Sequence, residues 1–299
     1  MRYFAWTAVA ALALVVTGAN AQQQDFSKIE IKTTDLGKDV YMLEGAGGIV
    51  TIAVGTNGVI MVDAQFAPMH DKLKAAIAKI TNEPISYLID THFHGDHTSG
   101  NAAFGKEGVI IIAQANVKNR LATPPPGANG QTPPAAPPEA LPSGVFTDKT
   151  TIAVANQSAE VIHVPNAHTD GDSIVYFPEA NVIAVGDIGK ANNYRYATID
   201  VRNGGTIDGT IAATQTVLDK ANDRTKIVLS HGPLATKADF QAYHDMLVKV
   251  RDRVKALKDG GKTEDQAVAA KPLADIQAEI MQNDMLSERM VRLTYETLK

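Results

Sequence analysis

The heptapeptide THFHGDH, residues 91–97, directly follows an apolar run at residues 85–89. Three histidines and an aspartate within six positions are hard to explain by packing, because a buried imidazole or carboxylate needs a polar partner. The alternation of an extended chain lets His92 and His94 point the same way, whereas Asp96 and His97 turn towards a neighbouring position. We therefore interpret the heptapeptide as part of a metal site rather than as a surface cluster of histidines.

The ligand types also indicate which metal the site would hold. The chain contains no cysteine, so the ligands for a metal ion are imidazole and carboxylate groups. Such nitrogen and oxygen ligands suit zinc, with manganese and iron as weaker alternatives.

The spacing His92-x-His94-x-Asp96-His97 resembles the signature of the metallo-β-lactamase-fold hydrolases. Four further residues match that family's pattern in the expected order, and each stands at the end of an apolar run or in a polar loop: Asp63, His168, Asp187 and His231. The resemblance covers nearly the whole chain after its first residues. It implies an α/β fold, a four-layer αββα sandwich in a single domain.

The resemblance also implies a dinuclear zinc centre. The implied ligands are His92, His94 and His168 for one zinc ion, Asp96, His97 and His231 for the other, and Asp187 as the bridge between them. Two adjacent zinc ions can hold a hydroxide that attacks a carbonyl, so no serine or cysteine nucleophile is needed. Asp96 would in addition orient the attacking hydroxide.

The substrate is less well defined by the sequence. Lys190, Asn193 and Tyr194 follow Asp187 in a stretch rich in hydrogen-bond donors. The spacing of Lys190 is similar to that of a lysine which holds the drug's carboxylate in one subclass of true β-lactamases, and this favours an anionic small molecule. True β-lactamases, however, carry cysteine or serine where this chain has Asp187, and a solvated Lys190 without a substrate role remains an open alternative.

Four classes of function follow from these motifs. The favoured one is β-lactamase-type hydrolysis, and the alternative is hydrolysis of a thioester, lactone or phosphodiester, which Asp187 favours. A metal-dependent oxidoreductase is less favoured because the flavodiiron relatives carry glutamate where this chain has His94. A non-catalytic metal-binding protein is disfavoured by the complete ligand sets.

The first residues have the parts of a secretory signal peptide. Met1-Arg2 precedes an apolar run at residues 5–16, and Ala19-Asn20-Ala21 provides a small-x-small cleavage site. The run is too short to span a bilayer. We predict cleavage after Ala21, which leaves residues 22–299 as one hydrolase domain, periplasmic or secreted and without stable membrane insertion.

The composition of the chain limits the classes of molecule that it is expected to bind. The formal charge is −5 with both signs mixed along the chain, which argues against a nucleic-acid-binding surface. Hydrophobic residues make up 44%, enough for one large core. Without cysteines, export would bring no disulfides, so packing and the metals would have to hold the fold.

The remaining pattern predicts the elements that carry these loops. Strands are expected at residues 29–32, 40–43, 49–54, 59–62, 85–89, 109–113, 151–154, 158–164, 173–177, 182–185 and 226–229, and helices at 68–80, near 99, at 210–218 and at 236–258. The glycine cluster at 45–48 is interpreted as a turn rather than as a close approach to the site. The proline-rich segment 123–142 is interpreted as a mobile surface loop in preference to a lid. His70, His163 and His244 are expected to be structural.

Overall fold

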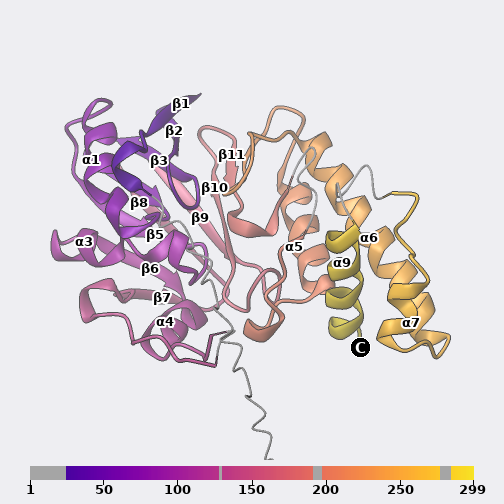
Figure 1. The fold of residues 1–299 in the computed structure, drawn as a ribbon. Helices are drawn as coiled ribbons and strands as arrows, with labels where there is room; N and C mark the ends of the chain where they lie inside the picture. Colours follow the sequence, from indigo (N-terminus) through magenta and orange to yellow (C-terminus); the bar gives the residue numbers. More distant parts are fainter. Residues whose placement is uncertain (1–24, 128–129, 191–196, 277–283) are drawn as a thin grey trace, which may run out of the picture.

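Two β-sheets packed face to face form the centre of the molecule in this computed structural model (Figure 1), which describes residues 25–127, 130–190, 197–276 and 284–299. The first sheet has the order β1 (Lys32–Gly37), β2 (Val40–Glu44), β3 (Val50–Gly55), β4 (Gly58–Val62), β5 (Ile85–Ile89), β6 (Ile110–Gln114) and β7 (Gly144–Phe146). The second has the order β12 (Lys226–Val228), β11 (Val182–Ala184), β10 (Ser173–Phe177), β9 (Gln157–His163) and β8 (Lys149–Val154).

The direction of the strands brings the polar loops together. Strands β1 to β4 pair antiparallel, whereas β4, β5, β6 and β7 run parallel to one another. In the second sheet β11 and β12 are also parallel. The carboxyl ends of parallel strands lie at the same edge of a sheet, and the polar stretches that hold Asp63, His92, Asp187 and His231 follow β4, β5, β11 and β12 respectively.

Alternation along β4 shows how one strand serves two cores. Ile60 and Val62 pack between the two sheets, with residues such as Val175 and Phe177 of the second sheet. Val59 and Met61 point the other way, into a core shared with Leu73 of α1. Both faces of the strand are therefore apolar, as expected for a strand buried on both sides.

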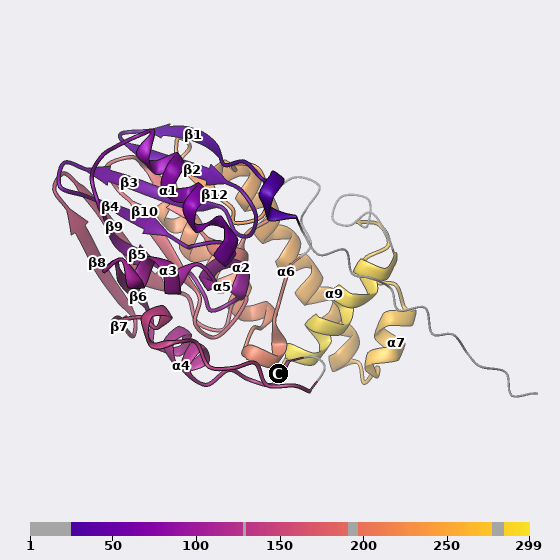
Figure 2. The ribbon, with the colours of Figure 1, turned by 60° about the vertical axis from the view of Figure 1, so that its left-hand side comes forward.

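The helices cover the two outer faces. They are α1 (His70–Ala78), α2 (Gly95–Thr98), α3 (Asn101–Lys106), α4 (Ala115–Ala122), α5 (Ile207–Lys220), α6 (Lys237–Asp259), α7 (Glu264–Ala269) and α9 (Asp284–Thr297). Helices α1 and α3 lie on the first sheet, and α5 and α6 on the second (Figure 2). This arrangement confirms the predicted α/β sandwich of four layers.

The C-terminal helices form a separate apolar cluster beyond α5. Thr236 caps the N-terminus of helix α6, and Thr236 and Asp239 make the reciprocal hydrogen bonds of a capping box. Its inner face, with Leu247 and Val250, packs against residues of α7 and α9 that include Met290 and Val291. These helices extend the sandwich on the side of the second sheet (Figure 1).

Three local expectations differ from the structure. The first strand begins at Lys32 rather than at residue 29, because Ile29 and Ile31 pack into the core beneath α1 without pairing in the sheet. Helix α4 is not expected from the sequence, and its few apolar residues explain why. Helix α5 begins at Ile207 rather than at residue 210, because Thr206 caps it by accepting a hydrogen bond from the Gly209 N–H.

Residues 1–24, with the predicted signal peptide, lie outside the described residues. Across the described ranges, no helix is both long enough and apolar enough to cross a bilayer.

Candidate metal centre

Seven side chains from four loops meet at the carboxyl edge of the two sheets. The ring nitrogens of His94 (Nδ1) and His168 (Nε2) lie 3.0 Å apart, and Asp96 Oδ2 lies 3.0 Å from His231 Nε2. Asp187 stands between these groups, with Oδ1 at 3.3 Å from both His97 Nε2 and His231 Nε2, and Oδ2 at 3.8 Å from His168 Nε2. One carboxylate thus faces two groups of ligands with its two oxygens.

Three overlapping groups of side chains have ligand atoms close enough to share an ion, within 4.8 Å of one another. They are His92, His94 and His168; His92, His97 and Asp187; and Asp96, His97 and His231. The first and third are the two ligand sets that the sequence resemblance implies. The second contains the expected bridging carboxylate.

Hydrogen bonds on the outer side of the rings fix which nitrogen faces the centre. The Nδ1 of His92 lies 3.1 Å from the Thr91 hydroxyl, that of His97 lies 2.8 Å from Asp63 Oδ2, and that of His168 is 2.5 Å from the Thr198 carbonyl oxygen. His94 is reversed, because its Nε2 contacts Asp200 Oδ2 at 3.0 Å. Each ring donates outward, so its other nitrogen can present a lone pair to the centre.

The buried polar atoms at the centre fit a cation. His92 Nε2, His97 Nε2 and Asp187 Oδ1 are buried and make no hydrogen bond with any described residue. Leaving three such atoms unpaired costs free energy, and a metal ion would satisfy all three together. The ligand chemistry therefore fits zinc or a similar divalent ion.

The electrostatics agree with this assignment. Burial lowers the pKa of His92 well below its usual range and that of His168 to about 4, so both rings are neutral at pH 7. Burial raises the pKa of Asp187, but the positive charges of His97 and Lys190 outweigh burial and hold this pKa well below its usual range. Neutral imidazoles and an ionised carboxylate are the forms that bind a metal.

His97 differs from the other rings. Burial lowers its pKa, but Asp63 and Asp187 outweigh burial and raise that pKa well above the usual range. The two carboxylates thus create a negative potential at His97 Nε2, which attracts a proton or a metal cation alike.

Asp63 and Thr91 tie the ligand loop to the first sheet. Asp63 is fully buried and accepts hydrogen bonds from the Thr91 amide at 2.8 Å and from the Thr91 hydroxyl at 2.9 Å. The same carboxylate contacts His97, so it supports two parts of the loop together. Asp63 therefore braces the ligand loop against the first sheet.

The glycine cluster at residues 45–48 packs against this loop, which corrects its interpretation as a simple turn. A side-chain carbon on Gly48 would lie 2.3 Å from the His97 ring, and one on Gly47, whose φ is +103°, would lie 2.4 Å from the Asp96 carbonyl oxygen. The Gly48 amide donates to that oxygen at 2.9 Å. Backbone without side chains is needed here because the two loops touch.

The predicted substrate-binding residues are placed only in part. Lys190 is buried, with 7% of its surface exposed, and its charge acts on Asp187. It is therefore not a solvated surface lysine, whereas its role towards substrate stays a prediction. Asn193 and Tyr194 lie outside the described residues.

Asp200 is a site residue that the sequence does not reveal. Burial raises its pKa, but hydrogen bonds from His94 and Asn203 outweigh burial and bring the pKa to about 2, so the carboxylate that supports His94 is ionised. Residues 94 and 200 are separated by 106 positions, and no motif links them. The one signal in the sequence that could have pointed to Asp200 is that it is an acidic residue a short distance after Asp187.

The three histidines expected to be structural lie away from the cluster. His163 Nε2 contacts the Asp170 carbonyl oxygen at 3.0 Å, and His244 Nδ1 contacts the Thr214 hydroxyl at 2.8 Å. His70 lies beside Asp71 and packs on Phe104. Each has a partner within the protein, as expected for a structural residue.

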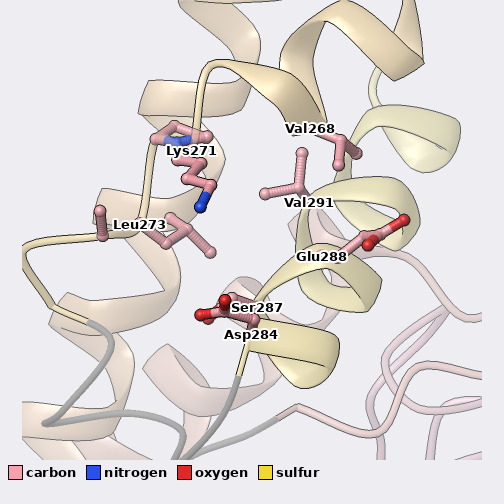
Figure 3. Close-up of a pocket in the computed structure, with 9 residues that line it drawn as sticks. Val268, Lys271, Leu273, Asp284, Ser287, Glu288 and Val291 are labelled. Atoms are coloured by element: carbon pink, nitrogen blue, oxygen red, sulfur yellow. The ribbon is translucent and has the colours of Figure 1, made fainter.

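A cavity of about 180 Å³ between α7 and α9 shares no lining residue with this cluster. Figure 3 shows Lys271 and Leu273 on one side of it and Asp284, Ser287 and Glu288 on the other. No histidine is among the described residues that line it, so it offers no second ligand set of the kind at the sheet edge.

Comparisons with known proteins agree with the fold and the motif. The family model of the metallo-beta-lactamase superfamily matches residues 45–232. A metallo-beta-lactamase from Pontibacter korlensis aligns with a TM-score of 0.59 at 18% identity, over 73% of this chain and 99% of that one. The DIM-1 metallo-beta-lactamase aligns with a TM-score of 0.60 at 14% identity, over 74% of this chain and 99% of that one. VMB-1 aligns with a TM-score of 0.59 at 15% identity, over 73% of this chain and 97% of that one.

At these identities the structural likeness establishes the fold alone. No curated protein sequence matches the chain.

Proposed function

The chain belongs to the metallo-beta-lactamase superfamily, and from this premise we propose that it is a metal-dependent hydrolase that opens an amide of the β-lactam type in a substrate bearing a carboxylate. Family membership supports metal-dependent hydrolysis in general. The narrower choice of substrate depends on residues of this chain.

The observation that carries the proposal is the convergence of unpaired ligand atoms. Five histidines present a ring nitrogen, and Asp96 and Asp187 a carboxylate oxygen, to one small volume at the sheet edge. The two ligand sets favour two metal ions per chain, and the ligand types favour zinc. Metal ions held there would supply a hydroxide nucleophile at neutral pH and would polarise the scissile carbonyl.

The protein's own contribution is positioning. The outer hydrogen bonds that the rings donate to Asp63, Thr91 and Asp200 hold the rings in one orientation, which limits the reorganisation needed during a reaction. Asp96 lies partly open to solvent, at 28% side-chain exposure, and can accept a proton or orient a water molecule at the centre.

Lys190 supports the choice of an anionic substrate. Its side chain is buried, and its positive charge acts on Asp187 of the cluster. A substrate carboxylate that reached this ammonium group would form a charge-assisted hydrogen bond with it. We assign Lys190 as the group that holds the carboxylate of the substrate.

Asp187 favours a second candidate function. The true β-lactamases of the family carry cysteine or serine at this position, whereas the thioesterase, lactonase and phosphodiesterase branches carry aspartate. Hydrolysis of a thioester, lactone or phosphodiester by the same centre is therefore the competing proposal.

The experiment that separates them compares hydrolysis of a chromogenic cephalosporin, a thioester and a lactone by the zinc-loaded protein. We expect metal-dependent opening of the cephalosporin, and we expect Lys190→Ala to raise KM for it while kcat changes little. An unchanged KM would remove the role of Lys190. Turnover of the thioester or the lactone alone would favour the competing proposal, in which Asp187 indicates a thioester or lactone hydrolase.

We also propose that the mature protein acts after export, in the periplasm or outside the cell, on the basis of the first 21 residues. N-terminal sequencing of the protein from its host would test the cleavage after Ala21.

A further inference from the structure

A cavity of about 520 Å³ opens beside the metal centre and is lined in large part by the proline-rich segment. Prolines 124–126, 133, 134 and 137 form one wall, and residues of α2 and α3 also line the cavity. His94 lines this cavity, and the same ring contacts His168 through Nδ1 at the centre. A molecule in the cavity would therefore lie against a ligand of the proposed metal site.

The walls are apolar, and two of the polar side chains among them are already paired. Arg120 donates to both carboxylate oxygens of Asp170 at 2.7 and 2.8 Å and to Asn203 at 2.7 Å, while its guanidinium group lies over the Phe93 ring. The Thr98 hydroxyl donates to backbone carbonyl oxygens of its own loop. With these groups occupied, the cavity favours an apolar occupant over a polar or charged one.

The proline wall is anchored to the helices on both sides. The Ala136 amide donates to the Leu121 carbonyl oxygen at 2.9 Å, and Asn101 donates to the Ala140 carbonyl oxygen at 3.4 Å. At the far end the chain packs so closely on Gly105 that a side-chain carbon there would lie 1.9 Å from the Glu139 carbonyl oxygen. Proline restricts the chain further, so little conformational freedom remains to be lost when the cavity is filled.

We propose that this cavity binds an apolar group, of phenyl size or larger, that the substrate carries next to the bond that is hydrolysed. The proposal rests on the proposed function for the identity of the occupant as part of a substrate. It deepens that function, because it assigns the proline-rich segment a role in specificity.

The test compares benzylpenicillin with its methyl analogue, in which an acetyl group replaces the phenylacetyl side chain. The zinc-loaded protein should prefer benzylpenicillin in kcat/KM by about tenfold or more, the effect expected when an apolar ring of this size is buried. Ala136 lines the cavity, and Ala136→Asp should reduce the preference by about tenfold, because it places a carboxylate in the apolar wall.

Ala135 provides a matched control, since it is the preceding residue of the same segment, is exposed and does not line the cavity. Ala135→Asp should retain the preference of the parent protein. Equal effects of the two substitutions, or a parent protein without any preference, would overturn the inference.

A binding measurement separates this inference from the proposed function. Calorimetric titration with phenylacetamide, which carries the phenyl group without a β-lactam ring, should give binding at least tenfold weaker in Ala136→Asp than in Ala135→Asp. That result retains the cavity assignment even if neither penicillin is hydrolysed, an outcome in which the proposed function fails. Equal affinity in the two variants overturns the assignment whatever the enzyme hydrolyses.

Discussion

The two ligand sets of the cluster are held to different degrees. In the set of His92, His94 and His168, every ring has a partner on its outer nitrogen, from Thr91, Asp200 and the Thr198 carbonyl oxygen respectively. In the set of Asp96, His97 and His231, only His97 has a comparable support among the described residues, and that support comes from Asp63.

Exposure follows the same division. The side chain of His231 is 37% exposed and that of Asp96 is 28% exposed, and no described residue hydrogen-bonds the Nδ1 of His231. A ligand set whose geometry is fixed in advance loses less conformational freedom when an ion binds. If the centre holds two metal ions, as we propose, we expect the set of three histidines to bind its ion more tightly than the other set does.

The largest effects should come from removing one ligand of each set. We expect His94→Ala and His231→Ala both to abolish turnover, because each disrupts a metal site that the reaction requires. Their metal content should differ: His231→Ala should retain about one tightly bound zinc ion per chain, and His94→Ala should retain less. Elemental analysis after dialysis measures this, with circular dichroism as the control for folding. Equal metal content in the two variants would contradict the comparison.

A smaller effect should follow from removing the carboxylate behind His94. Asp200→Asn keeps the size of the side chain but removes the charge that polarises the ring, so zinc affinity at the three-histidine set should fall about 10- to 100-fold. Competition with a chromogenic chelator measures the change. Asp148→Asn, at an exposed position, is the control and should leave the affinity as it was. An unaltered affinity in Asp200→Asn would show that this support is not needed.

The smallest effect should come from the hydroxyl that joins the two sets. The Thr91 hydroxyl donates to Asp63 and lies within hydrogen-bond distance of His92, so Thr91→Val leaves both without this partner. The metal-free protein should lose about 1 to 2 kcal/mol of its free energy of unfolding, measured by urea denaturation in the presence of a chelator. Thr91→Ser keeps the hydroxyl and should recover most of the loss. A similar loss in both variants would point to packing of the methyl group instead.

Much of the fold could be predicted because the ligand motifs and the strands occur in a regular order along the chain. Each apolar run of four to six residues ends at a polar loop, and parallel strands bring such ends to one edge. The capping box at Thr236 and Asp239 likewise follows from residues that are close in sequence.

The support of the cluster could not be predicted, because it depends on contacts between distant residues. Asp200 reaches His94 across 106 positions, and Gly48 lies against His97 from a different loop. The contact of His168 with the Thr198 carbonyl oxygen uses a main-chain atom that every residue has, so the residue type at position 198 does not indicate it. The proline-rich segment was expected to be a mobile loop because prolines exclude regular structure, yet the Ala136 amide and the Ala140 carbonyl anchor it to the helices beside it.

The way this segment is anchored has a consequence for how the protein can diverge in evolution. Its attachment to Leu121 and Asn101 uses main-chain atoms of the segment, and its stiffness comes from proline rings, so the alanine side chains that face the cavity carry little of the structural burden. Replacements at Ala136 can therefore accumulate without disturbing the histidine loop, which is constrained by Gly48 and Asp63. Selection can alter substrate preference at one wall of the site while the metal ligands stay the same, and directed evolution should begin there.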